Sequence, residues 1–259
     1  MIVAFGVSSP AVTDLASGHL PAAARLAWWG TSWLRGHVVT DLLLDAVLGP
    51  DATHVVAGLP GAEGTETLVA GLARLRSLGA SYVGAAFPAE GDPLGLGGPR
   101  EFNAEALEEG EAVVVAGTGL GLVPQRTGAA IAWRAIPAER RQLPDVGEAD
   151  RELRSALVES ANALAGLDVA QWRPEVADRL MNLRHREPLA APPGVPGRCV
   201  ELAARGLQAT EIVALALEDD GGALSSYEIE RRRSALTPLD RAGRRALTAA
   251  CSPEVWPPA

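Results

Sequence analysis

The sequence predicts an α/β fold: a mixed sheet with three parallel strands from βαβ units plus an antiparallel extension, followed by an all-helical C-terminal half. Apolar runs of strand length alternate with helical patterns in the first 87 residues. Three further runs follow between residues 111 and 136, and the turns between them are too short for a helical crossover. From residue 148 onward, apolar residues recur with the period of about 3.6 that is typical of helices.

The three expected parallel strands are apolar runs bounded by Gly, Pro and Ser: residues 2–7, 53–59 and 81–87. Between them, helical patterns cover residues 10–48, with a break near Gly18 to Pro21, and residues 65–78. Strands that alternate with helices favour parallel pairing through right-handed crossovers. The carboxyl ends of these strands are therefore expected at one common end of the sheet.

The antiparallel extension is expected from the runs at residues 111–116, 120–124 and 129–136. They follow a turn-rich loop, residues 89–99, and a short helix predicted over residues 101–109. Their connecting turns, residues 117–119 and 125–128, have the length of hairpin turns. These strands are therefore predicted to pair antiparallel within the same sheet.

The second half is predicted to consist of helices over residues 148–165, 174–186, 197–205, 210–218, 225–236 and 238–250. The last helix has a hydroxyl cap at Thr237, a proline at its first position and Asp240 in its first turn. The proline-rich residues 188–196 indicate a linker or a stiff strap. The change of pattern predicts an α/β sheet domain over residues 1–147 and a helical region over 148–259, packed on or beside it.

Composition excludes several classes of function. All 23 basic residues of the 259-residue chain are arginine, so there is no lysine for a Schiff base, a general base or a Walker-type phosphate loop. Pyridoxal enzymes, lysine-dependent aldolases and ordinary P-loop nucleotidases are therefore excluded. The net charge of −9 disfavours nucleic acids and anionic membranes as partners, because a field of this sign repels them.

The chain is expected to be a soluble protein of the cytoplasm. The residues after Met1 have neither the basic start nor the long apolar stretch of a signal peptide. No run of about 18 uncharged apolar residues predicts a membrane span. Cys199 and Cys251 lie in helical patterns and are expected to be reduced thiols in that compartment.

A first candidate site follows from the expected parallel strands, because ligands of open α/β sheets bind outside the carboxyl ends of such strands. The loops there carry Ser8, Ser9, Gly61, Glu63, Thr65, Glu66, Glu90 and Asp92, and the next helix begins with Arg100 and Asn103. Glu63 and Glu66 oppose a phosphate and favour a neutral or cationic ligand, or a divalent metal. The alternative is that these residues form ordinary surface turns, with Thr65 as a helix cap.

A second candidate site is formed by His37, Asp41 and Asp45, which are spaced four residues apart on one predicted helix. A carboxylate one turn from a histidine can orient the ring or raise its pKa, so the trio could supply a general base or metal ligands. The same spacing is typical of the solvated face of an amphipathic helix. The preceding tryptophans either build the core or form the wall of a pocket: Trp28, Trp29 and Trp33.

Residues 200–236 combine a helical run, the pair Gly206 and Leu207, a short helix and a final helix with Arg231 to Arg233. This rhythm resembles that of bacterial helix-turn-helix regulators, and the resemblance implies a recognition helix over residues 225–236. The acidic turn Glu218 to Asp220 departs from that pattern, because it would face phosphates. A bundle of helices with charged faces yields the same pattern.

Other signatures are incomplete. The segment Gly6 to Pro10 is similar to a nucleophile elbow but lacks the second glycine. The glycines Gly119 and Gly121 follow a strand, but Pro124 comes before a helix can start, which excludes a dinucleotide loop. No Cys-x-x-Cys or His-Glu-x-x-His pair provides the usual spacing of a zinc site.

Two functions are weighed on this basis. The first is binding of a small polar ligand or a divalent metal at the carboxyl end of the sheet, where catalysis could be carried by Glu63, Glu66, Asp92 or the pair His37 and Asp41. The second is a non-catalytic interaction or regulatory role of the helical half, through Arg231 to Arg233 and Arg244 to Arg245. The sequence defines neither a cofactor nor the oligomeric state.

Overall fold

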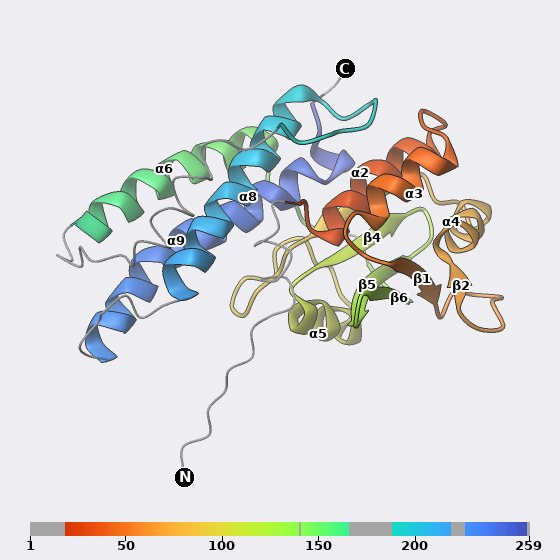
Figure 1. Ribbon diagram of the computed structural model, residues 1–259, viewed down its shortest axis with the longest axis horizontal. Helices are drawn as coiled ribbons and strands as arrows, with labels where there is room; N and C mark the ends of the chain where they lie inside the picture. Colours follow the sequence, from red (N-terminus) through yellow and green to blue (C-terminus); the bar gives the residue numbers. More distant parts are fainter. Residues whose placement is uncertain (1–18, 140, 166–187, 219–225, 258–259) are drawn as a thin grey trace, which may run out of the picture.

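The computed structural model describes residues 19–139, 141–165, 188–218 and 226–257, and a mixed sheet lies beside long helices in it (Figure 1). The strands are β1 (Thr53–Ala57), β2 (Glu66–Thr67), β3 (Tyr82–Ala86), β4 (Ala112–Ala116), β5 (Leu120–Thr127) and β6 (Ala130–Pro137). They form one six-stranded sheet in the order β2-β1-β6-β5-β4-β3. The expected α/β class and mixed sheet are confirmed.

The antiparallel meander β4-β5-β6 is present as expected. β5 and β6 pair along their whole length, from Leu120 opposite Pro137 to Thr127 opposite Ala130. β6 also pairs with β1, and this is the parallel pair of the sheet. The meander therefore supplies the centre of the sheet instead of extending one side of it.

The three neighbouring parallel strands of the sequence-based prediction are not seen. Residues 2–7 lie outside the described residues. β1 and β3 run in opposite directions, because three antiparallel pairings separate β3 from β6. The reason is β2, which pairs antiparallel with β1 and reverses the chain once before α4 (Leu68–Ser77) begins. The loops that follow β1 and β3 therefore leave the sheet at opposite ends.

Helices lie on both faces of the sheet. α4 packs on one face, in the main core, and requires Gly71, since a Cβ there would lie 2.6 Å from Val56 Cγ2. On the other face, α5 (Arg100–Glu109) forms a smaller core around Phe102, which lies against Gly121. The cap of α4 is Thr67, whose hydroxyl accepts a hydrogen bond from Ala70 N, and the prediction that Thr65 starts this helix was wrong.

Two further helices precede β1, and the boundary between them corrects a prediction. α2 (Ala22–Leu34) begins after Pro21, and α3 (Thr40–Leu48) packs on α2. A turn over residues 35–39 separates them, with Gly36 at a φ of 76°. His37 therefore lies in this turn and does not share a helix with Asp41 and Asp45.

The second half contains three long helices, α6 (Val146–Ala165), α8 (Gly197–Glu218) and α9 (Ser226–Ala250), and the short 3-10 helix η2 (Pro253–Val255). Helices α6, α8 and α9 pack on one another as a bundle (Figure 1). This half is not purely helical, because residues 188–196 form an irregular strap. Since α2 to α5 lie among the strands, helices occur throughout the described chain. The helix predicted over residues 174–186 lies outside the described residues.

The four helices predicted over residues 197–250 are in fact two continuous helices. Gly206 is not a turn residue: it lies inside α8, where a Cβ would come within 2.9 Å of Gly243 O in α9. At Gly206 the chain therefore does not form the turn of a helix-turn-helix motif, because this glycine lies within α8 and serves close helix packing. Likewise Pro238 lies inside α9, and the Thr237 hydroxyl donates to Arg233 O at 2.9 Å instead of capping a new helix.

The bundle and α2 close the free edge of β3. The hydroxyl of Thr31 in α2 accepts a hydrogen bond from Val83 N at 2.9 Å and donates one to Val83 O at 3.0 Å. Ala85 N donates to Cys251 O at 2.9 Å, and Ala85 O accepts from Arg141 Nη1 at 2.6 Å. Phe87 N donates to the hydroxyl of Thr248. The polar backbone groups of this edge are thus satisfied within the protein, which is how a buried strand edge is stabilised.

No helix within the described ranges combines the length and the apolar character needed to cross a lipid bilayer.

The contact between α8 and α9 gives a first prediction. Gly206→Val places a branched side chain against the backbone of Gly243, so we expect the free energy of unfolding to fall by about 1–3 kcal/mol. Urea denaturation followed by circular dichroism measures this change. Gly197→Val is the control, because a Cβ at Gly197 meets open space. Equal stability of the two variants would contradict the close packing described here.

Candidate functional site

The residues predicted at the carboxyl end of the sheet are dispersed. Gly61, Glu63 and Thr65 are exposed in the loop between β1 and β2. Glu66 pairs with Arg74, whose Nε lies 2.9 Å from Oε2, and this hydrogen bond lowers the pKa of Glu66 below its usual value. Glu90 and Asp92 follow β3 at the opposite end of the sheet. The geometric basis of a shared site is therefore missing.

Asp92 is buried and contacts three arginines of α9. Its carboxylate lies 3.1 Å from Arg245 Nη2, 3.3 Å from Arg244 Nη1 and 3.5 Å from Arg241 Nε. Arg244 also donates to Phe87 O. Asp92 therefore connects the loop after β3 to the bundle, and its oxygens are engaged within the protein.

The remaining residues of the expected site do not complete it. Arg100 is exposed at the first position of α5, and Asn103 Oδ1 accepts a hydrogen bond from Gly98 N at 3.0 Å. Ser8 and Ser9 lie outside the described residues. In the parts of the chain that the structure describes, no group of three or more His, Cys, Asp or Glu is arranged to hold a metal.

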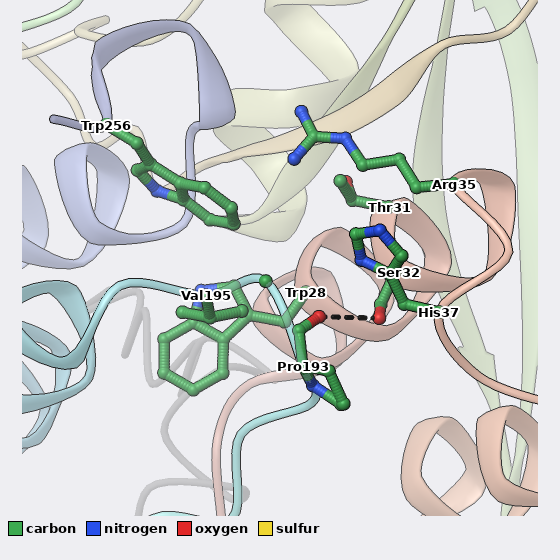
Figure 2. Close-up of a pocket in the computed structure, with 9 residues that line it drawn as sticks. Trp28, Thr31, Ser32, Arg35, His37, Pro193, Val195 and Trp256 are labelled. Carbon is green, nitrogen blue, oxygen red and sulfur yellow. Dashed lines mark hydrogen bonds between the residues drawn. The ribbon is translucent and has the colours of Figure 1, made fainter. Parts of the chain in front are cut away.

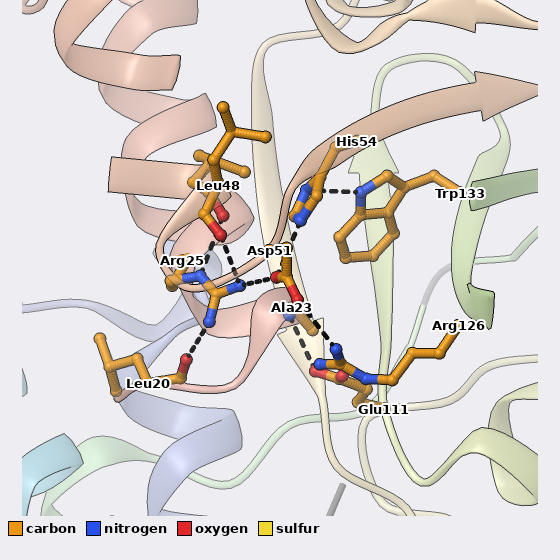
Figure 3. A network of polar contacts seen from close by, with 10 residues as sticks. Leu20, Ala23, Arg25, Leu48, Asp51, His54, Glu111, Arg126 and Trp133 are labelled. Carbon is orange, nitrogen blue, oxygen red and sulfur yellow. Dashed lines mark hydrogen bonds and ion pairs between the residues drawn. The ribbon is translucent and has the colours of Figure 1, made fainter. Parts of the chain in front are cut away.

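A buried polar network joins α2, α3, β1 and the β5–β6 hairpin (Figure 3). At its centre, Asp51 accepts hydrogen bonds from Arg25 Nη2 at 2.6 Å, Arg126 Nη1 at 3.0 Å and His54 Nε2 at 3.0 Å. Arg25 is 5% exposed and also donates to the carbonyls of Leu20 and, at the end of α3, Val47. The network therefore holds the segment before β1 against both helices.

The histidine of this network has a defined tautomer. The indole Nε1 of Trp133 can only donate, so the 3.2 Å bond to His54 Nδ1 makes that nitrogen an acceptor. The proton then resides on Nε2 and is donated to Asp51. Burial lowers the pKa of His54, although the hydrogen bond to Asp51 opposes this shift. Both ring nitrogens are used, so the pair Asp51 and His54 has a structural role and offers no free base.

The carboxylate partner is held in its charged form. Burial alone would raise the pKa of Asp51, but the hydrogen bond from His54 and the charges of Arg25 and Arg126 together keep this pKa below its usual value. The sequence patterns do not predict this network. Its local signal is the i, i+3 spacing of Asp51, just before β1, and His54, within β1, while Arg25, Arg126 and Trp133 join only through the fold.

A groove of about 430 Å³ opens where the end of α2, the strap and the C-terminal segment meet. Its lining residues define what we call the junction groove: Arg35, Gly194, Val195, Pro196, Pro253, Trp256 and Pro257. A narrower hollow beside it is lined by residues that include Trp28, Ser32 and His37, and Figure 2 shows these side chains around it. Pockets of roughly 300–1,000 Å³ between domains are the usual sites of small ligands.

Arg35 and Trp256 face each other in this region (Figure 2). The guanidinium carbon of Arg35 lies 6.0 Å from the ring centroid of Trp256. No carboxylate among the described residues forms an ion pair with Arg35. The indole N–H of Trp256 donates to Ala250 O at 2.9 Å, which anchors the C-terminal segment to α9. The groove thus presents an aromatic face and an arginine without an ion-pair partner in the described part of the chain.

The strap is held against α2 by short-range contacts. Ser32 Oγ donates to Pro193 O at 2.8 Å. Gly194 has a φ of 94°, a backbone conformation that favours glycine, and a Cβ there would lie 2.9 Å from Nδ1 of the exposed His37 side chain. Of the residues predicted to be catalytic, only His37 lies beside the groove, while Asp41 is exposed on α3.

The fold and the groove define a class of protein: an α/β sheet domain whose edge strand is closed by a helical bundle, with a groove at the junction. Residues 23–148 match the N-terminal domain of Rv1486c-like proteins, and residues 147–248 match their C-terminal domain. The chain belongs to this family of Rv1486c-like proteins.

Two relatives are similar over nearly the whole chain. The protein Rv1486c of Mycobacterium tuberculosis strain H37Rv is 29% identical over 289 aligned positions, which cover 91% of this chain and 98% of the relative. The protein MT1533 of strain CDC 1551 has the same identity and coverage. Both relatives carry the name of uncharacterised proteins. No solved structure matches the chain significantly.

The buried network predicts a pH dependence of stability. Because the pKa of His54 is lower in the folded than in the unfolded protein, its contribution to stability is fully present above the unfolded value of about 6.5 and is lost as the pH falls from that value through the lower pKa of the folded protein. We expect the free energy of unfolding to decrease from about pH 7 to pH 5 in chemical denaturation.

His54→Gln should flatten this decrease, whereas His37→Gln, a change at an exposed histidine, should leave it intact. The same slope in His54→Gln as in the parent protein would show that His54 does not cause the pH dependence.

Proposed function

We propose that this protein binds a small ligand in the junction groove. The observation that carries this proposal is the convergence, in one groove of about 430 Å³, of three segments that are far apart in the sequence. Each wall is fixed by contacts of its own: the strap by Ser32, the C-terminal segment by Trp256. A preformed groove between rigid elements lowers the entropy cost of binding.

The composition of the groove supports binding more than catalysis. Its lining includes one arginine, one tryptophan and three prolines, and it includes no Asp or Glu. Arginine does not act as a base at neutral pH. The buried pair Asp51 and His54, which has the composition of an acid–base pair, is fully engaged elsewhere.

The alternative function, interaction through the arginines of the helical half, is less favoured. Arg244 and Arg245 are directed to Asp92, and Arg232 is buried in the bundle. Arg231 and Arg233 remain exposed on α9. Two exposed arginines on a solvated helix face do not by themselves define a partner surface.

The proposal is tested by a fragment screen observed by NMR on the complete chain, with small acids, amines and neutral compounds. We expect the binding fragments to shift the indole N–H signal of Trp256. Val195→Trp should block this binding, because it fills the groove. The control Val158→Trp, at a residue that is 62% exposed on α6, should not. Fragments that bind equally well to Val195→Trp would overturn the proposal.

A further inference from the structure

The chemistry of the junction groove points to a more specific ligand, and this inference rests on the proposed function. We infer that the groove binds an aromatic monocarboxylate, whose carboxylate meets Arg35 while its ring lies against Trp256 and the prolines. Four features of the described residues support this assignment.

The first feature is the unpaired charge of Arg35. The chain carries 32 acidic residues and 23 arginines, and many of its arginines lie against carboxylates, as Arg74 and Arg244 do. Within the described ranges Arg35 has no such partner, although it is exposed beside a groove. Its planar guanidinium can donate two parallel hydrogen bonds to one carboxylate. A ligand with an anionic group would therefore supply the ion-pair partner of the Arg35 guanidinium.

The second feature is the distance between Arg35 and the indole ring. Arg76 lies over Trp33 with 3.7 Å between its guanidinium carbon and the ring centroid, a close stack. The same distance for Arg35 and Trp256 is 6.0 Å. The guanidinium of Arg35 is therefore not packed flat on the indole, and its N–H groups stay available to a ligand that lies beside the ring.

The third feature is the apolar character of the opposite wall. Trp256 uses its only donor for Ala250 O, so the indole offers the ligand an aromatic surface and no hydrogen bond. Val195, Pro196 and Pro253 continue this surface. Planar aromatic groups pack well on such a wall, where stacking contributes beyond the burial of area.

The fourth feature is the limit that charge sets on the ligand. The carboxylate of Glu254, between Pro253 and Trp256 in the sequence, is paired with Arg141 at 3.2 Å and does not line the groove. The groove lining contains one arginine, Arg35, and the chain has a net charge of −9, so the groove matches a ligand that carries one negative charge. Nucleotide polyphosphates need several cations or a nest of backbone N–H groups, so they do not fit this groove.

The inference is tested by isothermal titration calorimetry of the complete chain with 2-naphthoate and with its neutral isostere 2-naphthamide. We expect 2-naphthoate to bind at least about tenfold more tightly than the amide. Arg35→Gln should weaken 2-naphthoate binding roughly 10- to 100-fold, the effect of losing a charge-assisted hydrogen bond, and should leave amide binding unchanged. Arg154→Gln, an exposed arginine of α6, is the control and should not change either affinity.

The outcomes separate the two proposals. Equal affinities for the carboxylate and the amide, both abolished by Val195→Trp, would overturn the carboxylate assignment and leave the groove as a ligand site. Loss of 2-naphthoate affinity in Arg154→Gln as large as in Arg35→Gln would also overturn the assignment. Binding that Val195→Trp does not affect would overturn the groove itself.

Discussion

The closure of the β3 edge is the interaction on which the arrangement of this protein depends. An edge strand exposes a row of backbone N–H and C=O groups, which invites pairing with other chains. Here the hydroxyl of Thr31 serves both groups of Val83, while Cys251 O and Arg141 serve those of Ala85. These partners come from α2, the linker before α6 and the end of α9. The hydrogen bonds to the backbone groups of β3 therefore fix the bundle relative to the sheet.

The junction groove is a consequence of this closure. The end of α9 must reach β3, and the C-terminal segment then returns past α2, where Trp28 and Trp256 both donate their indole N–H groups to Ala250 O. The strap is held on the same side by Ser32. Arg35, at the end of α2, is left between these segments. Ligand binding there would stabilise the junction of sheet and bundle, since a ligand selective for the folded state raises its stability.

The sequence predicts the elements of this fold better than their arrangement. The apolar runs that became β1, β3 and the meander are strong local signals, because each strand lies in a packed sheet. β2 has no such signal, because it consists only of Glu66 and Thr67 and shows no apolar pattern. Its antiparallel pairing with β1 nevertheless reverses the chain, so that β3 runs opposite to β1. Gly206 was interpreted as a turn, since a sequence does not distinguish a glycine that bends the chain from one that lets helices approach. The groove was missed because Arg35, Gly194 and Trp256 meet only in three dimensions.

The most direct test of this account is amide hydrogen exchange of β3 in the native protein, measured residue by residue by NMR. We expect the amides of Val83, Ala85 and Phe87 to exchange slowly, within roughly tenfold of the amides of Val113 and Leu122 in the inner strands, because opening them requires the bundle and α2 to separate from the sheet. Rapid exchange at these three positions, with Val113 and Leu122 still protected, would show that the edge is open and would contradict the account.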